Sequence, residues 1–291
     1  MKQLTNSPIS NTPLKPYLVC KDHTVSKELF TILIDEETEL LVTSPRPDDV
    51  SLSKYYESED YISHSNSNKS LFDKIYQVVR NYTLSQKIKL INSFNSEEKT
   101  LLDIGAGTGD FLFKCHTDGW KVEGIEPSIN ARELAEQKTG KKLKIQISEL
   151  GTHKYDVITM WHVLEHVPNL TEYVSQLKTL LKPNGTIVVA VPNHKSFDAS
   201  YYGEFWAAYD VPRHLWHFSQ TAIRSLVAKE NMKVIQILPM KFDAFYVSLL
   251  SEKYKKGKMN ALKAFSIGLR SNLKAKRTNE FSSLIYVIKK A

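Results

Sequence analysis

The sequence predicts an α/β fold built on a doubly wound, Rossmann-like sheet of seven strands, the last of them antiparallel. Three observations point to it. Apolar, strand-like segments alternate with segments of helical period from residue 98 onward, a glycine-rich turn follows the first of these strands, and an acidic residue ends the second. Ligands of such sheets bind beyond the carboxyl ends of the strands. We therefore expect the functional residues in the loops that follow the strands.

The strands expected in this part of the chain cover residues 100–104, 121–125, 143–147, 156–161, 186–191, 234–238 and 283–288. Segments of helical period lie between them at 111–117, 129–138 and 170–181. The segment 180–185, Leu-Leu-Lys-Pro-Asn-Gly, ends a helix and turns into the fifth strand, because Pro and Gly punctuate regular structure.

Three parts are expected along the chain. Residues 1–50 start with a polar stretch, 1–16, that we expect to be unstructured, and continue with short strands at 29–33 and 40–43. Residues 51–97 combine a tyrosine-rich segment with amphipathic helix over 70–93. Residues 98–291 form the main domain, with an insertion at about 240–280 that is long enough to be a lid.

Composition limits the class of protein. The chain has 291 residues, of which 42% are hydrophobic and 24% charged, as is usual for globular domains. It has no apolar run of membrane-spanning length and no signal-peptide pattern, so we expect a cytoplasmic protein, monomeric or homodimeric, without stable membrane insertion. Cys20 and Cys115 form no disulfide framework.

The central motif is Leu101 to Asp110, LLDIGAGTGD, in which a strand runs into the glycines 105, 107 and 109. Glu126 ends the next strand, where its carboxylate can accept hydrogen bonds from both hydroxyls of a ribose. A nicotinamide dinucleotide would require Gly or Ala where Asp110 stands, and an acid there would repel its pyrophosphate. S-adenosylmethionine carries a sulfonium and an ammonium and no phosphate. The motif therefore favours the methyl donor.

Four segments resemble the class I S-adenosylmethionine-dependent methyltransferases, and among them the ubiquinone-pathway O-methyltransferases: 101–112 (LLDIGAGTGDFL), 122–128 (VEGIEPS), 155–169 (YDVITMWHVLEHVPN) and 180–193 (LLKPNGTIVVAVPN). The resemblance implies a methyltransferase that uses S-adenosyl-L-methionine and acts on a small molecule. The cofactor-binding residues that it implies are Tyr56, Tyr61, His64, Asp103, Gly105, Gly107, Gly109, Glu126, Pro127, Ser128, Ser148, Glu149, Leu150, Trp161 and His162. Among these, residues 148–150 would meet the adenine, and the tyrosine-rich segment would close over the amino-acid end, unless it is only a cap with surface tyrosines.

The N-terminal part resembles a cap in which a small zinc ribbon precedes a Pro-Arg-Pro turn. Cys20 stands at one ligand position, but Asp35 and Thr38 stand where a second C-x-x-C pair would be expected. Structural zinc needs four closed ligands, so we expect a metal-free remnant. His162 and His166 are spaced for one helical face, yet the H-E-x-x-H pattern is absent, and we predict no metal there either.

Transfer to a hydroxyl would use a base, for which His166, His214 and His217 are the candidates, although His166 could equally pack or cap a helix. Trp206 would line the acceptor site or belong to the core, and Arg213 would pair with an anionic acceptor. Residues 251–280 carry nine basic and two acidic side chains. Such a patch indicates an acidic acceptor, a membrane surface or nucleic acid, or only a solvated helix face.

The leading prediction is methylation of a small molecule, with oxygen favoured over carbon or nitrogen as the acceptor atom. A nicotinamide-dependent oxidoreductase and a non-catalytic S-adenosylmethionine-binding protein remain alternatives. No Asn-Pro-Pro-Tyr type signature follows the fourth strand, so a nucleic-acid substrate is not expected.

Overall fold

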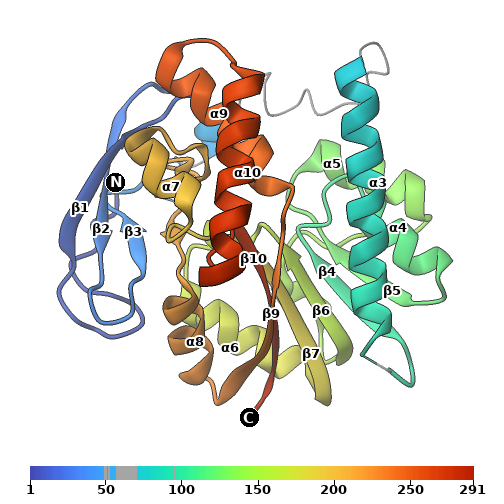
Figure 1. Cartoon of the computed structure of the whole chain (residues 1–291). Helices are drawn as coiled ribbons and strands as arrows, with labels where there is room; N and C mark the ends of the chain where they lie inside the picture. The colour runs from blue at the N-terminus through green and yellow to red at the C-terminus, as the bar shows by residue number, and fades with distance from the viewer. Residues whose placement is uncertain (49–50, 52, 57–70, 95) are drawn as a thin grey trace.

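A six-stranded sheet forms the centre of the computed structural model, which describes residues 1–48, 51, 53–56, 71–94 and 96–291 (Figure 1). Its strand order is β5-β4-β6-β7-β10-β9. The strands are β4 (Thr100–Ile104), β5 (Lys121–Ile125), β6 (Tyr155–Trp161), β7 (Leu181–Pro192), β9 (Met232–Pro239) and β10 (Ser283–Lys290). β10 pairs antiparallel with β7 and with β9, whereas β5, β4, β6 and β7 pair in parallel. The mostly parallel sheet with an antiparallel last strand is confirmed.

The predicted strand at 143–147 is wrong. Only Lys144 bridges Ile125, and a 3-10 turn, Ile147–Leu150, begins at the end of the predicted range. The amide of Leu143 donates instead to the Glu136 carboxylate (3.0 Å). The segment therefore lies at the edge of the sheet as a single bridge, and the central sheet has six strands among the described residues instead of seven.

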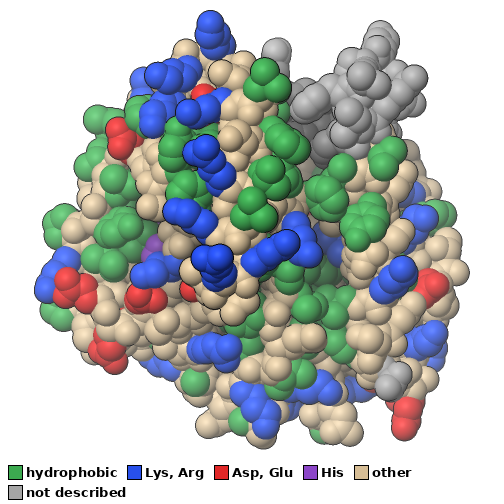
Figure 2. Space-filling model, viewed as in Figure 1, with side chains coloured by type: hydrophobic (Ala, Val, Ile, Leu, Met, Phe, Trp, Pro, Cys, Tyr) green, Lys and Arg blue, Asp and Glu red, His purple; other side chains and the backbone are tan. Residues whose placement is uncertain are grey.

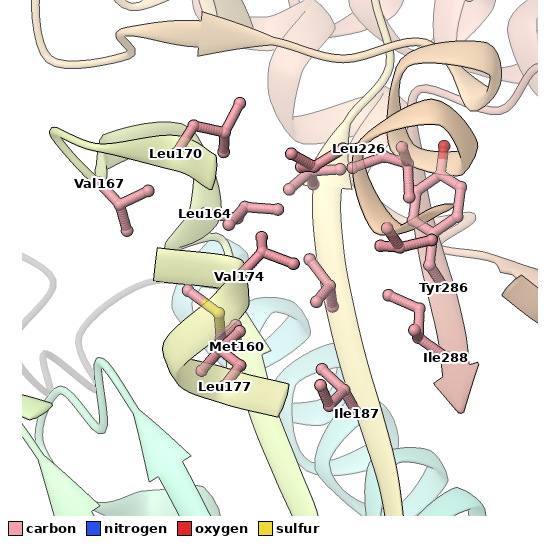
Figure 3. Packing of buried hydrophobic residues seen from close by; sticks show 14 of the residues in the cluster. Met160, Leu164, Val167, Leu170, Val174, Leu177, Ile187, Leu226, Tyr286 and Ile288 are labelled. Carbon is pink, nitrogen blue, oxygen red and sulfur yellow. The ribbon is translucent and has the colours of Figure 1, made fainter. Parts of the chain in front are cut away.

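Helices cover both faces of the sheet because its strands alternate their apolar side chains. Ile187 and Val189 of β7 pack with α6 (Leu170–Leu180) and α8 (Gln220–Ala228), as Figure 3 shows for Ile187, Val174 and Leu226. Val188 faces the other layer. That layer consists of α3 (Leu71–Asn92), α4 (Asp110–Thr117) and α5 (Ile129–Thr139).

A second, four-stranded sheet of order β1-β2-β3-β8 lies beside the main domain (Figure 1). It contains β1 (Lys15–Lys21), β2 (Leu29–Ile34), β3 (Leu41–Thr43) and β8 (Trp216–His217). The last of these comes from the main domain and pairs with β3. The short helix α7 (Phe197–Tyr202) and two 3-10 turns, Gly203–Phe205 and Ala207–Tyr209, pack on this sheet through the core cluster around Trp206.

The N-terminal residues are more ordered than the sequence predicts. The hydroxyls of Ser10 and Thr12 donate to the Asp35 carboxylate (2.8 and 3.1 Å), and Ile9 is buried in the main core. Thr38 also donates to Asp35 through its hydroxyl. Burial would raise the pKa of Asp35, but hydrogen bonds, among them those from Thr38 and Ser10, outweigh it and lower the pKa to about 2. In the part of the chain that resembles a zinc ribbon, the Asp35 carboxylate with its hydroxyl donors thus connects the N-terminal residues to the turn at Thr38.

The insertion expected at about 240–280 forms two packed helices, α9 (Asp243–Lys256) and α10 (Ala261–Thr278), between β9 and β10. They stand at the carboxyl-terminal end of the parallel strands, across from α3 (Figure 1). That they act as a lid stays a prediction. Among the described residues, we find no helix with the length and apolar character needed to cross a membrane.

Candidate functional site

The three glycines of the loop after β4 differ in their surroundings, since two are closely packed and one faces open space. Gly105, Gly107 and Gly109 have φ angles of 72°, 55° and 77°, which residues with a side chain rarely adopt. A Cβ atom added to Gly105 would lie 2.4 Å from Val163 Cγ2, and one added to Gly109 would lie 2.8 Å from Ala135 Cα. One added to Gly107 would meet nothing within 4 Å. A ligand can therefore approach the backbone at Gly107.

Glu126 lies beside that opening and is held by the backbone. The amide of Gly107 donates to its Oε2 (2.7 Å) and the amide of Ser128 to its Oε1 (2.9 Å). Hydrogen bonds to a carboxylate are strong, so the side chain is fixed in place. Each oxygen has a further lone pair, which leaves both able to accept from a diol. Pro127 and Ser128 are exposed next to it, and Ser128 caps α5.

Asp103 lies within β4 with 2% of its surface exposed. The Thr159 hydroxyl donates to its Oδ1 (2.6 Å), but burial outweighs this bond and raises the pKa of Asp103 to about 7. The carboxyl is therefore close to half-ionised at neutral pH. A cationic ligand near it would favour the ionised form.

Lys87 is a site residue that the sequence analysis missed. Its Nζ lies over the Trp161 ring, 4.0 Å from the ring centroid. Burial lowers the pKa of Lys87 to about 8, against the attraction of Asp103 and Asp243. The signal was available, since Lys87 occupies the same face of α3 as Leu84 and Ile91, which pack inward. A lysine on the buried face of an amphipathic helix indicates a special environment.

The loop after β6 connects this region to α9. Trp161 packs edge-on against Phe111, with 5.4 Å between ring centroids. His162, at φ 58°, places its Nδ1 3.4 Å from Glu165 Oε1 and its Nε2 3.1 Å from Asp243 Oδ2. Burial alone would lower the pKa of His162, but the interactions with the carboxylates of Asp243 and Glu165 raise it to about 10. His162 is therefore an imidazolium at neutral pH.

A cluster of one buried and two half-buried side chains adjoins His162. Glu165, His166 and His214 each offer one ligand atom, and these atoms lie within 4.8 Å of one another. The two histidines bond backbone carbonyls through Nδ1: His166 with Arg213 O (3.0 Å) and His214 with Ala208 O (2.8 Å). A carbonyl only accepts, so each Nδ1 carries the proton. Burial and the nearby His214 lower the pKa of His166 to about 4, so that ring is neutral.

Two imidazoles and a carboxylate, with histidine Nδ1 groups oriented by carbonyls, form a ligand set that a divalent metal could use. The sequence pattern around His162 and His166 predicts no metal site. The structure instead brings His166 together with His214 and Glu165. The absence of a metal stays a prediction.

Three residues expected at the acceptor site belong to the packing between the two sheets. Arg213, 3% exposed, contacts the carboxylates of Asp22 (3.3 Å) and Asp210 and donates to the Tyr55 carbonyl (3.0 Å). Its guanidinium is engaged within the chain, so the prediction that it binds an anionic acceptor does not fit this structure. Trp206, 2% exposed, donates its indole N–H to Asp198 and lies in the second core cluster.

His217, the third of these residues, is 4% exposed and bonds the Thr43 hydroxyl (3.0 Å). Burial holds the pKa of His217 well below its usual range. Its position on the short strand β8, paired with β3, makes it part of the joint between the sheets. These contacts indicate a structural histidine, and its role as a base stays a prediction.

The remaining predicted residues are distributed as follows. Ser148 and Glu149 are exposed in the 3-10 turn after β5, while Leu150 is buried in the main core. Tyr61, His64 and the side chain of Tyr56 lie outside the described part of the chain.

Comparison with known proteins agrees with this geometry. The family described as a methyltransferase domain matches residues 76–237. The ubiquinone biosynthesis O-methyltransferase of Rickettsia prowazekii is 26% identical over 209 residues, covering 65% of this chain and 81% of that protein. The enzyme of the same name from Photobacterium profundum is 32% identical over 108 residues, covering 34% and 46%.

Among solved structures, magnesium protoporphyrin IX methyltransferase from Synechocystis PCC 6803 with bound S-adenosylhomocysteine has a TM-score of 0.56 at 13% identity, covering 84% of this chain and all of that one. Geranyl diphosphate C-methyltransferase from Streptomyces coelicolor has a TM-score of 0.51 at 13% identity, covering 79% and 88%. These likenesses establish the fold. With the family match over more than half of its length, the chain belongs to the methyltransferase-domain family and is an S-adenosylmethionine-dependent methyltransferase.

Proposed function

We propose that the chain transfers a methyl group to a hydroxyl oxygen of a small acceptor that is anionic or aromatic. Relatives that share 26–32% identity are named as O-methyltransferases, which favours oxygen. The basic side chains of residues 251–280 favour a negatively charged acceptor. The observation that carries the cofactor part of the proposal is the carboxylate of Glu126, fixed by two backbone amides beside the open side of Gly107.

In this proposal each residue around the glycine loop binds a different part of the cofactor. Glu126 accepts from the ribose hydroxyls, and the missing side chain of Gly107 lets the ligand approach. Asp103 favours the ammonium group, and Lys87 is the cation for the carboxylate end. When bound, S-adenosylmethionine supplies a methyl group on a sulfonium. The chain accelerates its displacement by holding the acceptor oxygen in line, which geometry alone can do strongly.

Proton removal from the acceptor falls to His214 or His166. His162 is protonated and cannot accept a proton, and His217 lies in the joint between the sheets. The proton of each candidate ring is on Nδ1, so Nε2 is the accepting atom. The buried carboxylate of Glu165 stabilises the imidazolium that forms.

Calorimetry with S-adenosylhomocysteine tests the cofactor assignment. Glu126→Ala should weaken binding at least tenfold, because two charge-assisted hydrogen bonds are lost. Glu133→Ala, on the exposed side of α5, is the matched control and should bind like the wild type. Unchanged affinity in Glu126→Ala would overturn the assignment.

Turnover on a panel of phenols, catechols and hydroxy acids, followed by release of S-adenosylhomocysteine, tests the acceptor. Products methylated on oxygen are expected, and exclusive methylation of carbon or nitrogen would contradict the proposal. His214→Gln should lower kcat, with the KM for the cofactor unchanged. His217→Gln should lower Tm and leave kcat close to that of the wild type.

A further inference from the structure

Helix α10 buries mainly small side chains and exposes most of its large apolar ones. Ala264, Gly268, Ser271 and Ala275 are buried, as is the larger Ile267. Leu262, Phe265, Leu269 and Leu273 are 87%, 59%, 42% and 51% exposed. A surface helix of a soluble domain ordinarily has the reverse arrangement, with the large apolar residues against the core. The exposed set therefore needs a separate explanation.

The four exposed side chains form one continuous stripe. Their spacing of three, four and four residues places them on one face of the helix, opposite the buried set. Figure 2 shows apolar side chains running along α10. Two further exposed aromatic side chains, Phe242 before α9 and Tyr82 of α3, contact each other edge-on, with 5.8 Å between ring centroids.

Close packing against α9 fixes which face of α10 points outward. A Cβ atom on Gly268 would lie 2.8 Å from Phe245 Cδ1 and 3.0 Å from the Ala244 carbonyl oxygen. Only small side chains fit between helices that lie so close. Phe265 stacks on Phe245 at the edge of this contact, with 5.3 Å between ring centroids. The stripe therefore cannot turn inward without separating the two helices.

Basic side chains border the stripe on the side of α7. Lys263 and Lys274 lie over the rings of Tyr201 (5.6 Å) and Phe197 (4.0 Å). Of the two acidic residues in 251–280, Glu252 is buried and accepts a hydrogen bond from Tyr202, so the exposed charge is almost entirely positive. Figure 2 shows the Lys and Arg side chains in rows next to the apolar stripe.

We propose that this face of α10 docks on an anionic membrane surface, with the helix axis in the plane of the interface. Leu and Phe on one side and Lys and Arg on the flank are the arrangement that partitions into the boundary between headgroups and acyl chains. Anionic lipids add attraction for each nearby lysine or arginine. A second copy of the chain is a poorer occupant, because two such basic faces would repel each other.

Vesicle flotation of the full-length protein tests the proposal. The lipids are phosphatidylcholine alone and phosphatidylcholine with 30% phosphatidylglycerol. Wild type should float with the anionic vesicles, with at least a tenfold larger bound fraction than with neutral ones, and 0.5 M NaCl should reduce this binding. The stripe variant Leu262→Ser/Leu269→Ser/Leu273→Ser should lose at least tenfold in binding. The matched control Val19→Ser/Leu29→Ser, exposed on the N-terminal sheet, should bind like the wild type.

Unfolding and cofactor binding are measured on the same samples. The stripe variant should keep its Tm and its affinity for S-adenosylhomocysteine, which separates surface binding from folding and from the methyltransferase site. Equal binding of stripe and control variants overturns the proposal. So does wild type that ignores the anionic vesicles, or that instead forms a dimer in sedimentation which the stripe variant abolishes.

Discussion

Glu126 and Glu165 follow two strands of the same sheet, yet they are held in opposite ways. Glu126 accepts hydrogen bonds from backbone amides within its own neighbourhood and borders open space. Glu165 is fully buried, and the groups around it are the side chains of His162, His166 and His214. The first arrangement depends on local backbone geometry. The second depends on charges that distant parts of the chain bring together.

Glu126 therefore belongs to a ligand site, whereas Glu165 belongs to a group of side chains from separate loops, called the Glu165 cluster below. A carboxylate fixed by amides can exchange solvent for a ligand without disturbing the fold. A sealed carboxylate next to an imidazolium stabilises the surrounding loops only while both charges remain. Mutations at the two positions should therefore affect different properties of the protein.

The largest expected effect is on folding. Glu165→Gln should lower the free energy of unfolding by about 3 kcal/mol or more, because it leaves His162 with one of its two carboxylates. Glu126→Gln should cost about 1 kcal/mol or less, since only hydrogen bonds at a partly open site change. Urea denaturation of both variants measures this. Equal losses would remove the distinction between the two carboxylates.

The glycine loop offers the next test, within the ligand site itself. Gly109→Ala should destabilise the protein by about 2 kcal/mol, because its Cβ would collide with the backbone of α5. Gly107→Ala has open space and should cost about 1 kcal/mol from its positive φ alone. S-adenosylhomocysteine titration should rank them the other way, with the larger fractional loss of affinity in Gly107→Ala. The same ranking in both measurements would contradict the assignment of Gly107 to the ligand.

His162 makes the stability that the Glu165 cluster contributes sensitive to pH. Its folded-state pKa of about 10 exceeds the unfolded value near 6.5, so its contribution to stability is complete below pH 6.5 and is lost as the pH rises through 10. Wild type should therefore exceed His162→Gln in stability at pH 6, and the gap should narrow at pH 8 and again at pH 10. Thermal unfolding of both proteins at the three pH values provides the check. A gap independent of pH would show that the ring is not charged.

Asp103 gives the smallest effect. Its pKa of about 7 means that the carboxyl ionises as the pH rises from 6 to 8, and the ionised form attracts the ammonium of the cofactor. Affinity for S-adenosylhomocysteine should rise about threefold to tenfold over this range. Asp103→Asn should bind more weakly, and its affinity should no longer rise with pH, because Lys87, with a pKa of about 8, can only lose positive charge over this range. A variant that keeps the wild-type slope would place the titrating group elsewhere.

The sequence predicts the cofactor site better than the contacts between distant loops, because the signals for the cofactor site are local. The strands predicted at 100–104 and 121–125 match β4 and β5, and these strands position the glycine loop and Glu126. By contrast, Arg213 meets Asp22 across 191 residues of chain, and no local pattern indicates such a pair. The expectation that Arg213 pairs with an anionic acceptor therefore lacks the internal partner that only the fold supplies.

The errors in secondary structure have the same origin. The segment 143–147 alternates apolar residues with Lys144 and Gln146, as a strand would. At the edge of the sheet, however, its backbone groups bond side chains as well as a neighbouring strand. Residues 1–16 have the composition of a loose end, yet Asp35 supplies the carboxylate that orders their hydroxyls. In both cases a tertiary partner outweighs the local preference.

The two-residue strand β8 has a practical consequence for anyone dividing this chain. Its partner β3 comes from the first fifty residues, while the loop that carries it supplies His214 and Arg213. A truncated enzyme that starts at the glycine-loop strand would expose Trp216 and leave the guanidinium of Arg213 without Asp22. The first fifty residues therefore complete the packing of the loop that carries β8. An exchange of these residues between relatives will require exchanging that loop together with them.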